Sequence, residues 1–275
     1  MSGVAQTAAA ADRIALSIRQ WPVPAAQGTI ILVHGGGEHA GRYEETALRL
    51  NRDGFSVVAP DLRGYGRSPG QRGHILRFEE YLEDVATCLE AHVPAEQRPP
   101  ILLGHSLGGL VCTYYAVAHP ETIRCLVLSS PLWGLNVPVP AWKHHLARVL
   151  SALWPAFSMA RPTHSAEVLS HDPQVGRRYE DDPLVHIDVS CRFYTEMRRC
   201  LEQLPQVLPK LTVPVLVLQA GDDRVASTDA TRRLFPLVGS AQKRLIVYEG
   251  YYHEILNEVG KERVIQDLMT WLRSR

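Results

Sequence analysis

A serine flanked by glycines, between an apolar run and a helix-like run, is the feature that most constrains this chain. The apolar residues 100–103 precede the pentapeptide Gly-His-Ser-Leu-Gly at 104–108, and residues 109–116 have a helix-like composition. Glycines two positions before and after the serine let backbone pass close to backbone, so the turn can be tight and the hydroxyl can project. We therefore expect a buried strand, a sharp turn with Ser106 at its tip, and then a helix.

Apolar runs alternate with segments of helical spacing along most of the chain. The expected strands are residues 13–21, 29–33, 56–60, 100–103, 125–128, 213–218 and 244–248. The expected helices are residues 42–53, 78–92, 109–116, 228–238 and 257–273. This alternation predicts an α/β fold, with a mostly parallel central sheet and helices on both faces. The first strand alternates apolar and polar residues, which favours an edge position.

The alternation stops between residues 132 and 210, where no convincing buried strand is found. This segment is rich in Trp, Pro and Leu, and it carries an apolar stripe of helical spacing at Leu146, Val149, Leu150, Leu153 and Phe157. We interpret it as a helical cap inserted between two late strands, over the carboxyl ends where open α/β sheets bind ligands. The predicted organisation is a core from 1–131 with a loose tail over about 1–11, a cap from 132–210, and a second core part from 211–275.

Composition excludes several classes of protein. The chain has 275 residues, with 29 Lys and Arg against 29 Asp and Glu, so a nucleic-acid partner is not expected. Five scattered cysteines in apolar segments are typical of reduced core residues and a cytoplasmic protein. The alanine-rich start lacks the features of a signal peptide, and no stretch is apolar enough to span a membrane.

A serine hydroxyl is a weak nucleophile unless a base accepts its proton and an acid orients that base. The turn around Ser106 matches the nucleophile elbow of α/β-hydrolases, in which acid and histidine follow the serine in that order. Asp222 and Asp223 follow the strand at 213–218, and His253 follows the last strand. His253 is the only histidine C-terminal to these aspartates. Side chains of neighbouring residues point in different directions, so only one of the two aspartates can face the imidazole of His253. The sequence spacing does not distinguish Asp222 from Asp223.

Acyl transfer also needs hydrogen-bond donors for the oxyanion. The elbow offers the backbone N–H of Leu107, and a second donor is expected from the glycine cluster at 34–37, which resembles the loop of lipases and esterases. The same cluster formally fits a dinucleotide fingerprint, Gly35-x-Gly37-x-x-Ala40, with Asp61 after the next strand. A dinucleotide-binding oxidoreductase is therefore a remote alternative, although Glu38 would place a carboxylate beside the pyrophosphate.

Three segments together carry a resemblance to a known family. His-Gly-Gly-Gly-Glu-His-Ala-Gly-Arg-Tyr at 34–43, Asp-Leu-Arg-Gly-Tyr-Gly-Arg-Ser at 61–68 and the serine pentapeptide resemble the monoacylglycerol lipase family of serine α/β-hydrolases, which is related to lysophospholipases. The resemblance runs from about residue 21 to the end of the chain. It implies catalytic Ser106, Asp223 and His253, oxyanion donors at the N–H groups of Gly36 and Leu107, and an alcohol-side pocket at Glu38, Arg42 and Tyr179. Bracing of the glycine loop by an ion pair is the alternative role for the pocket residues.

The resemblance implies a serine hydrolase that cleaves monoacylglycerols to fatty acid and glycerol through an acyl-enzyme, with no metal or organic cofactor. The cap would hold the acyl chain, and its stripe would touch lipid surfaces, making the protein cytoplasmic and peripheral at membranes. Alternatives within the fold are a lysophospholipase, an esterase of short-chain or aromatic esters, and a ligand-binding protein without catalysis.

Overall fold

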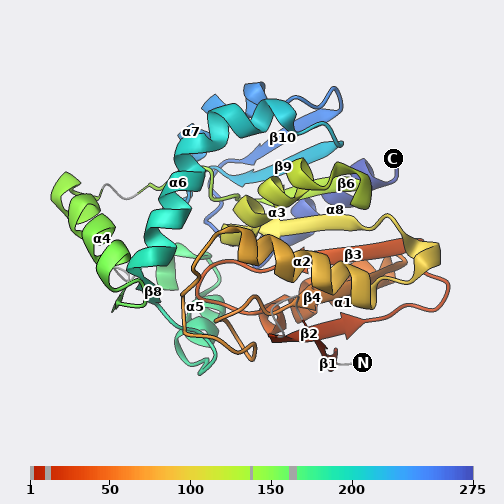
Figure 1. The fold of residues 1–275 in the computed structure, drawn as a ribbon. Coiled ribbons are helices and arrows are strands. Elements are labelled where there is room, and N and C mark those ends of the chain that lie inside the picture. The colour runs from red at the N-terminus through yellow and green to blue at the C-terminus, as the bar shows by residue number, and fades with distance from the viewer. Residues whose placement is uncertain (1–2, 10–13, 137–138, 161–165, 275) are drawn as a thin grey trace.

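The computed structural model describes residues 3–9, 14–136, 139–160 and 166–274. In these residues eight strands form one sheet in the order β1-β2-β4-β3-β5-β6-β9-β10 (Figure 1). The strands are β1 (Val4–Ala9), β2 (Ala15–Trp21), β3 (Gly28–Val33), β4 (Phe55–Pro60), β5 (Ile101–His105), β6 (Cys125–Ser129), β9 (Val215–Ala220) and β10 (Lys243–Tyr248). The β2 strand pairs antiparallel with β1 and β4, and the remaining pairs are parallel. The predicted α/β-hydrolase fold with a mostly parallel sheet is confirmed.

The N-terminus differs from the prediction. The expected loose tail is wrong for Val4–Ala9, because β1 pairs with β2 from Val4 opposite Gln20 to Ala9 opposite Ala15. The edge position expected for β2 is therefore taken by β1, which satisfies the outer backbone groups of β2. Alanine has weak strand propensity, so the sequence gives little sign of this strand. Residues 1–2 and 10–11 of the predicted tail lie outside the described residues, as does residue 13 of the predicted strand.

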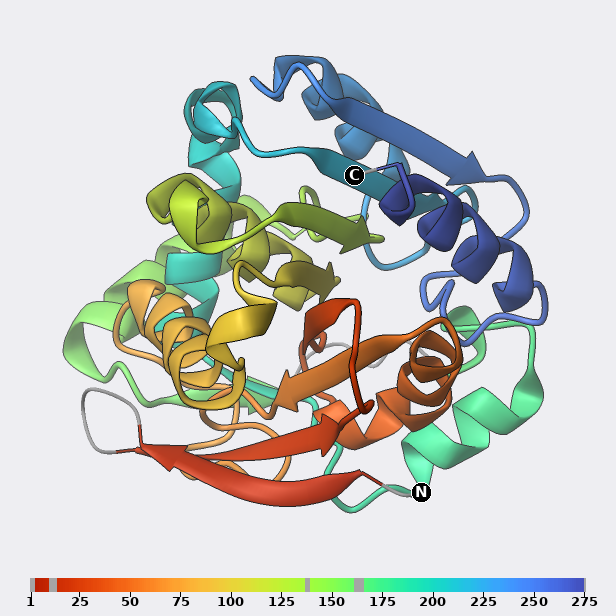
Figure 2. The ribbon, with the colours of Figure 1, turned by 90° about the vertical axis from the view of Figure 1, so that its right-hand side faces the viewer.

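Helices cover both faces of the sheet. Figure 2 shows α1 (Glu44–Arg52) and α8 (Lys261–Leu272) on one side, and α2 (Glu79–His92) and α3 (Leu107–Ala118) on the other. The strand residues alternate accordingly, since Ile30 and Leu32 pack with the first pair of helices while Ile31 and Val33 pack with the second. A continuous apolar run is therefore what a strand buried on both faces requires. The predicted helix at 257–273 begins later, at Lys261, directly after Gly260.

The described residues between β6 and β9 form three α-helices and one pair of short antiparallel strands. These are α4 (Ala141–Leu153), β7 (Ser158–Ala160), α5 (Pro173–Glu180), β8 (Asp188–Ser190) and α6 (Cys191–Val207). The α4 helix lies apart from the sheet and packs along α6 (Figure 1). The later turns of α6, with Cys200 and Leu204, belong to the main apolar cluster beside α2 and α3. Strands β7 and β8 are three residues each, too short for a recognisable alternation.

The parallel strands determine where the loops meet. Because β3, β5, β6, β9 and β10 run the same way, the loops at their carboxyl ends gather at one edge of the sheet. These loops contain the glycine cluster, the serine turn, the two aspartates and His253. Of the helices described, none combines the length and apolar composition that crossing a bilayer requires.

Candidate active site

Ser106 sits in a strained turn between β5 and α3. Its backbone has φ 52° and ψ −117°, a conformation that costs an L-residue on the order of 1–3 kcal/mol and is typical of functional sites. A Cβ on Gly104 would lie 2.4 Å from the carbonyl oxygen of Gly108, and one on Gly108 would lie 2.3 Å from that of Val33. Both positions therefore require glycine. The Ser106 N–H donates to the carbonyl of Ser129 at 3.0 Å, which fixes the turn against β6.

The structure brings together a serine, a histidine and an aspartate. The Nε2 of His253 lies 2.9 Å from the Oγ of Ser106, and its Nδ1 lies 2.8 Å from the Oδ2 of Asp223. All three side chains are buried, with Ser106 retaining 8% exposure. Asp222, the alternative left open by the sequence, is exposed, and its N–H donates to the carbonyl of Tyr251. Asp223 is therefore the aspartate that faces the imidazole.

Backbone and side-chain donors orient the Asp223 carboxylate. Its Oδ1 accepts the N–H groups of Val225 at 2.8 Å and Ala226 at 2.9 Å, which leaves Oδ2 for the histidine. The side-chain amide of Gln219, at the end of β9, lies 3.3 Å from Oδ2, and Thr231 donates to the amide oxygen of Gln219. Sequence reasoning missed Gln219, whose signal is a lone polar residue in an otherwise apolar strand.

The surroundings of His253 favour its protonated form. Burial alone would lower the pKa of His253, but the Asp223 carboxylate, assisted by Glu254 and Glu38, raises it above the ordinary value. The ring of His105 packs beside it, with centroids 4.8 Å apart. Burial, together with the positive charge that His253 can carry, lowers the pKa of His105 to about 4. His105, the histidine beside Ser106 in the sequence, is therefore neutral at ordinary pH.

The glycine loop after β3 passes beside the serine. A Cβ on Gly35 would lie 3.2 Å from the Cβ of Ser106 and 2.8 Å from the Oε1 of Glu38. Gly37 has φ 88°, and its carbonyl accepts the N–H of His186 from the inserted segment at 3.0 Å. Gly36 is the next residue of this loop, and Leu107, the first residue of α3, directly follows Ser106.

Glu38 and Arg42 form a buried ion-pair network. Glu38 accepts the N–H of Gly35 at 2.7 Å, the hydroxyl of Tyr43 at 2.6 Å and Nη1 of Arg42 at 2.6 Å. Arg42 also forms a two-pronged pair with Glu254, at 2.7 and 2.9 Å, and its guanidinium lies 4.9 Å from the ring centre of Tyr179. Burial alone would raise the pKa of Glu38, but Arg42 and nearby histidines lower it to about 2.

This network bears on both readings of residues 34–43. Glu38 and Arg42 brace the glycine loop. Both carboxylate oxygens of Glu38 and the guanidinium of Arg42 form hydrogen bonds with protein groups. A pyrophosphate would have to displace the Glu38 carboxylate from the Gly35 N–H, and Asp61 accepts the N–H groups of Ala40 and Arg67 instead of a ribose. The geometry therefore does not support a dinucleotide site.

Another buried carboxylate, that of Glu258, ties the inserted segment to the loop that carries His253. Glu258 accepts the backbone N–H groups of His171, Tyr252 and Val259, and the hydroxyl of Ser170. Burial would raise the pKa of Glu258, but the N–H groups of Val259, Tyr252 and His171, together with the His171 side chain, lower it. The N–H of Glu254 also donates to the carbonyl of Leu169 at 2.8 Å. No role for Glu254 or Glu258 is predicted from the sequence. Their closeness to His253 in the sequence is the one signal that could have indicated it.

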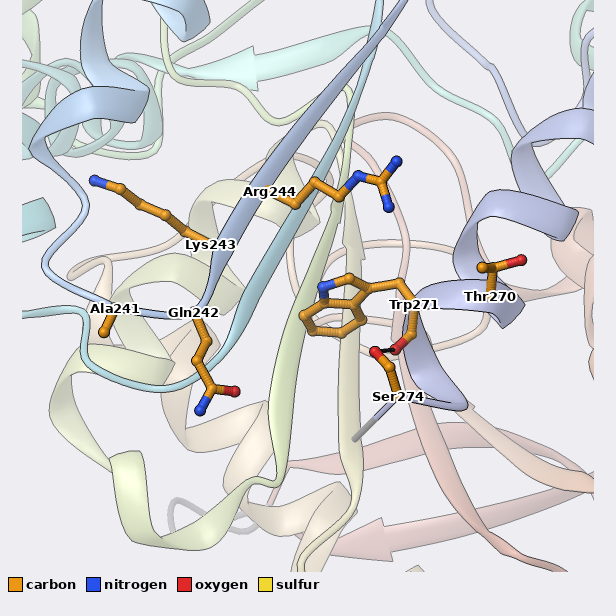
Figure 3. A pocket seen from close by; sticks show the side chains of 7 residues that line it. All are labelled: Ala241, Gln242, Lys243, Arg244, Thr270, Trp271 and Ser274. Carbon is orange, nitrogen blue, oxygen red and sulfur yellow. Dashed lines mark hydrogen bonds between the residues drawn. The ribbon is translucent and has the colours of Figure 1, made fainter.

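A surface pocket lies away from this chemistry. It has a volume of about 520 Å³ and is lined by Ala241, Gln242, Lys243, Arg244, Thr270, Trp271 and Ser274 (Figure 3). These residues come from the amino end of β10 and the last turns of α8, whereas Ser106 follows the carboxyl end of β5. Within the described ranges, no group of three or more His, Cys, Asp or Glu side chains is arranged to hold a metal ion.

Comparisons with known proteins identify the family of this chain. Residues 24–260 match the family described as serine aminopeptidase, S33. A monoacylglycerol lipase from Mycolicibacterium smegmatis is 34% identical over 255 residues, covering 90% of this chain and 89% of the relative. Phospholipase YtpA from Bacillus subtilis is 31% identical over 250 residues, covering 90% and 95%.

A solved structure extends the likeness to three dimensions. The crystal structure of the Paleococcus ferrophilus monoacylglycerol lipase superposes with a TM-score of 0.86 at 33% identity, covering 94% of this chain and 98% of that one. The chain therefore belongs to the serine aminopeptidase S33 family of α/β-hydrolases, and its likeness to monoacylglycerol lipases agrees with the resemblance expected from its motifs.

Proposed function

We propose that this protein hydrolyses the ester bond of monoacylglycerols to fatty acid and glycerol. The observation that carries the proposal is the chain of two hydrogen bonds from Ser106 through His253 to Asp223. Such a chain activates a serine for attack on a carbonyl. One relative named monoacylglycerol lipase and another named monoglyceride lipase support the choice of a lipid ester as substrate.

The proposed reaction has two half-reactions. As the Oγ of Ser106 bonds to the ester carbonyl carbon, its proton passes to Nε2 of His253 and negative charge develops on the carbonyl oxygen. The bond to the glycerol oxygen then breaks, and that oxygen takes the proton from His253. Water repeats the sequence on the acyl-enzyme, giving its proton to His253, and Ser106 recovers a proton as the fatty acid leaves.

The backbone N–H groups of Gly36 and Leu107 are the proposed oxyanion donors. Two observations support them: the glycine loop passes beside the Cβ of Ser106, and α3 begins at Leu107, so that its first N–H groups face the turn. Losing one such donor costs other enzymes about 10²–10³-fold in kcat.

The alcohol side of the pocket is assigned to Glu38, Arg42 and Tyr179, with different roles. Both carboxylate oxygens of Glu38 and both terminal nitrogens of Arg42 engage protein partners, which favours the bracing role for these two. Tyr179 is half-buried above Arg42. We infer that Tyr179 lines the glycerol side with its ring, beside the ion pair of Glu38 and Arg42.

The inserted segment, residues 132–210, is the proposed cap over the acyl chain. Large apolar side chains are exposed on one face of α4 and at the residue that follows the helix. They are Trp142, Leu146, Val149, Leu153 and Trp154, each between 45% and 79% accessible. Lys143 lies over the ring of Trp142 beside this face. An apolar stripe flanked by basic residues fits transient contact with a lipid surface, which would bring the protein to membranes from the cytoplasm.

The test measures hydrolysis of monoacylglycerols of several chain lengths, a lysophosphatidylcholine and a short p-nitrophenyl ester, by the wild type and by Ser106→Ala. We expect the highest kcat/KM for a monoacylglycerol, with turnover lost in Ser106→Ala. A preference for lysophosphatidylcholine would favour the alternative that the Bacillus subtilis phospholipase suggests. Turnover of the short ester alone would leave an esterase and reject the glycerol-side assignment.

A further inference from the structure

His34 lies directly before the glycine loop, and its side chain is completely buried. Its Nδ1 lies 2.7 Å from the carbonyl oxygen of Gly35, and its Nε2 lies 3.0 Å from the backbone nitrogen of Leu62. The ring of Tyr65 packs edge-on against it, with centroids 5.5 Å apart. Both ring nitrogens therefore have partners, and the ring is held by contacts on its edge and face.

These partners determine where the ring carries its proton. A backbone N–H can only donate, so Nε2 must accept from Leu62. The single proton of the neutral ring is then on Nδ1, which donates to the Gly35 carbonyl. Burial lowers the pKa of His34, and this effect outweighs the opposing charges of Asp61 and Glu38, so the ring stays neutral.

The Gly35 carbonyl and the Gly36 N–H belong to one peptide unit. In a trans peptide the C=O and N–H bonds point in opposite directions. A donor that holds the carbonyl on one side consequently aims the N–H at the other. The preceding peptide is held as well, because the Gly35 N–H donates to Glu38 at 2.7 Å.

We propose that His34 is a positioning residue that orients the Gly36 N–H toward the developing oxyanion by holding the Gly35 carbonyl. The inference rests on the proposed function, because it concerns the donor assigned there to Gly36. His34 touches neither the serine nor the substrate in this scheme. Its contribution is to keep one peptide plane from rotating during the reaction, which preserves a preorganised donor.

Two near-isosteric variants separate the two ring nitrogens. Asparagine can place its amide NH₂ near the Nδ1 position and donate to Gly35, whereas glutamine can place its carbonyl oxygen near Nε2 and accept from Leu62. We expect His34→Gln to lower kcat about 10²–10³-fold with KM changed less than about 3-fold, and His34→Asn to stay within about 10-fold of wild type. The affinity of a trifluoromethyl ketone, which forms an oxyanion on the serine, should fall only in His34→Gln. Equal activity of the two variants, whether high or low, would overturn the proposal.

Nitrogen-15 NMR of the wild-type histidines gives a test that does not depend on whether variants fold. A neutral His34 ring protonated at Nδ1 is the expected result, and a ring protonated at Nε2 or at both nitrogens would contradict it. Failure of the proposed function is recognised separately, because the wild type would then show no Ser106-dependent preference for monoacylglycerol.

Discussion

Arg42 donates two hydrogen bonds to the carboxylate of Glu254, at 2.7 and 2.9 Å, across 212 positions of the sequence. Through this pair the glycine loop after β3 is joined to the loop that carries His253, since Glu254 is the next residue. The same guanidinium bonds Glu38, so one cation lies between two buried carboxylates. The proposed oxyanion loop and the proposed base are thereby held as one unit.

The first prediction concerns this cation. Arg42→Met should destabilise the fold by about 3–5 kcal/mol, because it leaves two buried carboxylates without their counter-charge. Arg49→Met is the matched control: Arg49 pairs with Asp53 at 2.6 Å but is partly exposed, so about 1 kcal/mol or less is expected. Urea unfolding measures both. Similar losses in the two variants would show that the buried network adds nothing beyond a surface pair.

Glu254→Gln should change the pH dependence of activity. The negative charge of Glu254 helps to raise the pKa of His253, and the base must be neutral to act. Activity is present above that pKa and lost as pH falls through it, so removing the charge should move the acidic limb of kcat/KM to lower pH, by up to about one unit. Glu249→Gln is the control, since Glu249 is exposed and pairs with Arg232. An unshifted limb in Glu254→Gln would reject this electrostatic role.

Replacing each aspartate distinguishes the two candidates that the sequence left open. Asp223→Asn should lower kcat about 10⁴-fold, because an amide can hold the imidazole in the wrong tautomer and cannot stabilise its cation. Asp222→Asn should leave kcat within about 2-fold, since that side chain is exposed. Steady-state hydrolysis of a soluble ester measures both. A large loss in the Asp222 variant would contradict the geometry of the site.

The exposed stripe of α4 predicts a difference between substrates. Leu146→Asp should lower activity on dispersed monoacylglycerol about 10-fold, and leave hydrolysis of a soluble ester unchanged, because a charge opposes insertion into a lipid surface. Leu237→Asp offers a control, since this leucine is similarly exposed but follows α7 (Thr228–Leu234), outside the inserted segment. Equal losses of Leu146→Asp on both substrates would indicate damage to the fold or the pocket instead of the surface contact.

Much of the site was readable from local spacing. The need for glycine at 104 and 108, the turn at Ser106 and the single histidine after the late aspartates all follow from residues close together in the chain. Periodicity of two and of about 3.6 likewise indicated most strands and helices. These features depend on backbone geometry and on alternating burial. Both can be inferred from the types of residues that lie close together in the sequence.

Other features depend on contacts between distant segments. The pairing of Val4–Ala9 with β2 has no strong local signal, because alanine favours neither an edge strand nor a loose tail. The structure alone places Glu258 against residues 170–171 and pairs Arg42 with Glu254.

The two aspartates show most clearly which features the sequence determines and which depend on the tertiary structure. From the sequence, Asp222 and Asp223 both follow a strand in the right order, and only the family resemblance separated them. Three-dimensional packing turns one toward His253 and the other toward solvent, because the N–H groups of Val225 and Ala226 hold the Asp223 carboxylate inward. Sequence therefore determined which kinds of residue meet at the carboxyl edge of the sheet. Which atoms face one another there was decided by the folded loops, whose side-chain directions depend on partners far away in the chain.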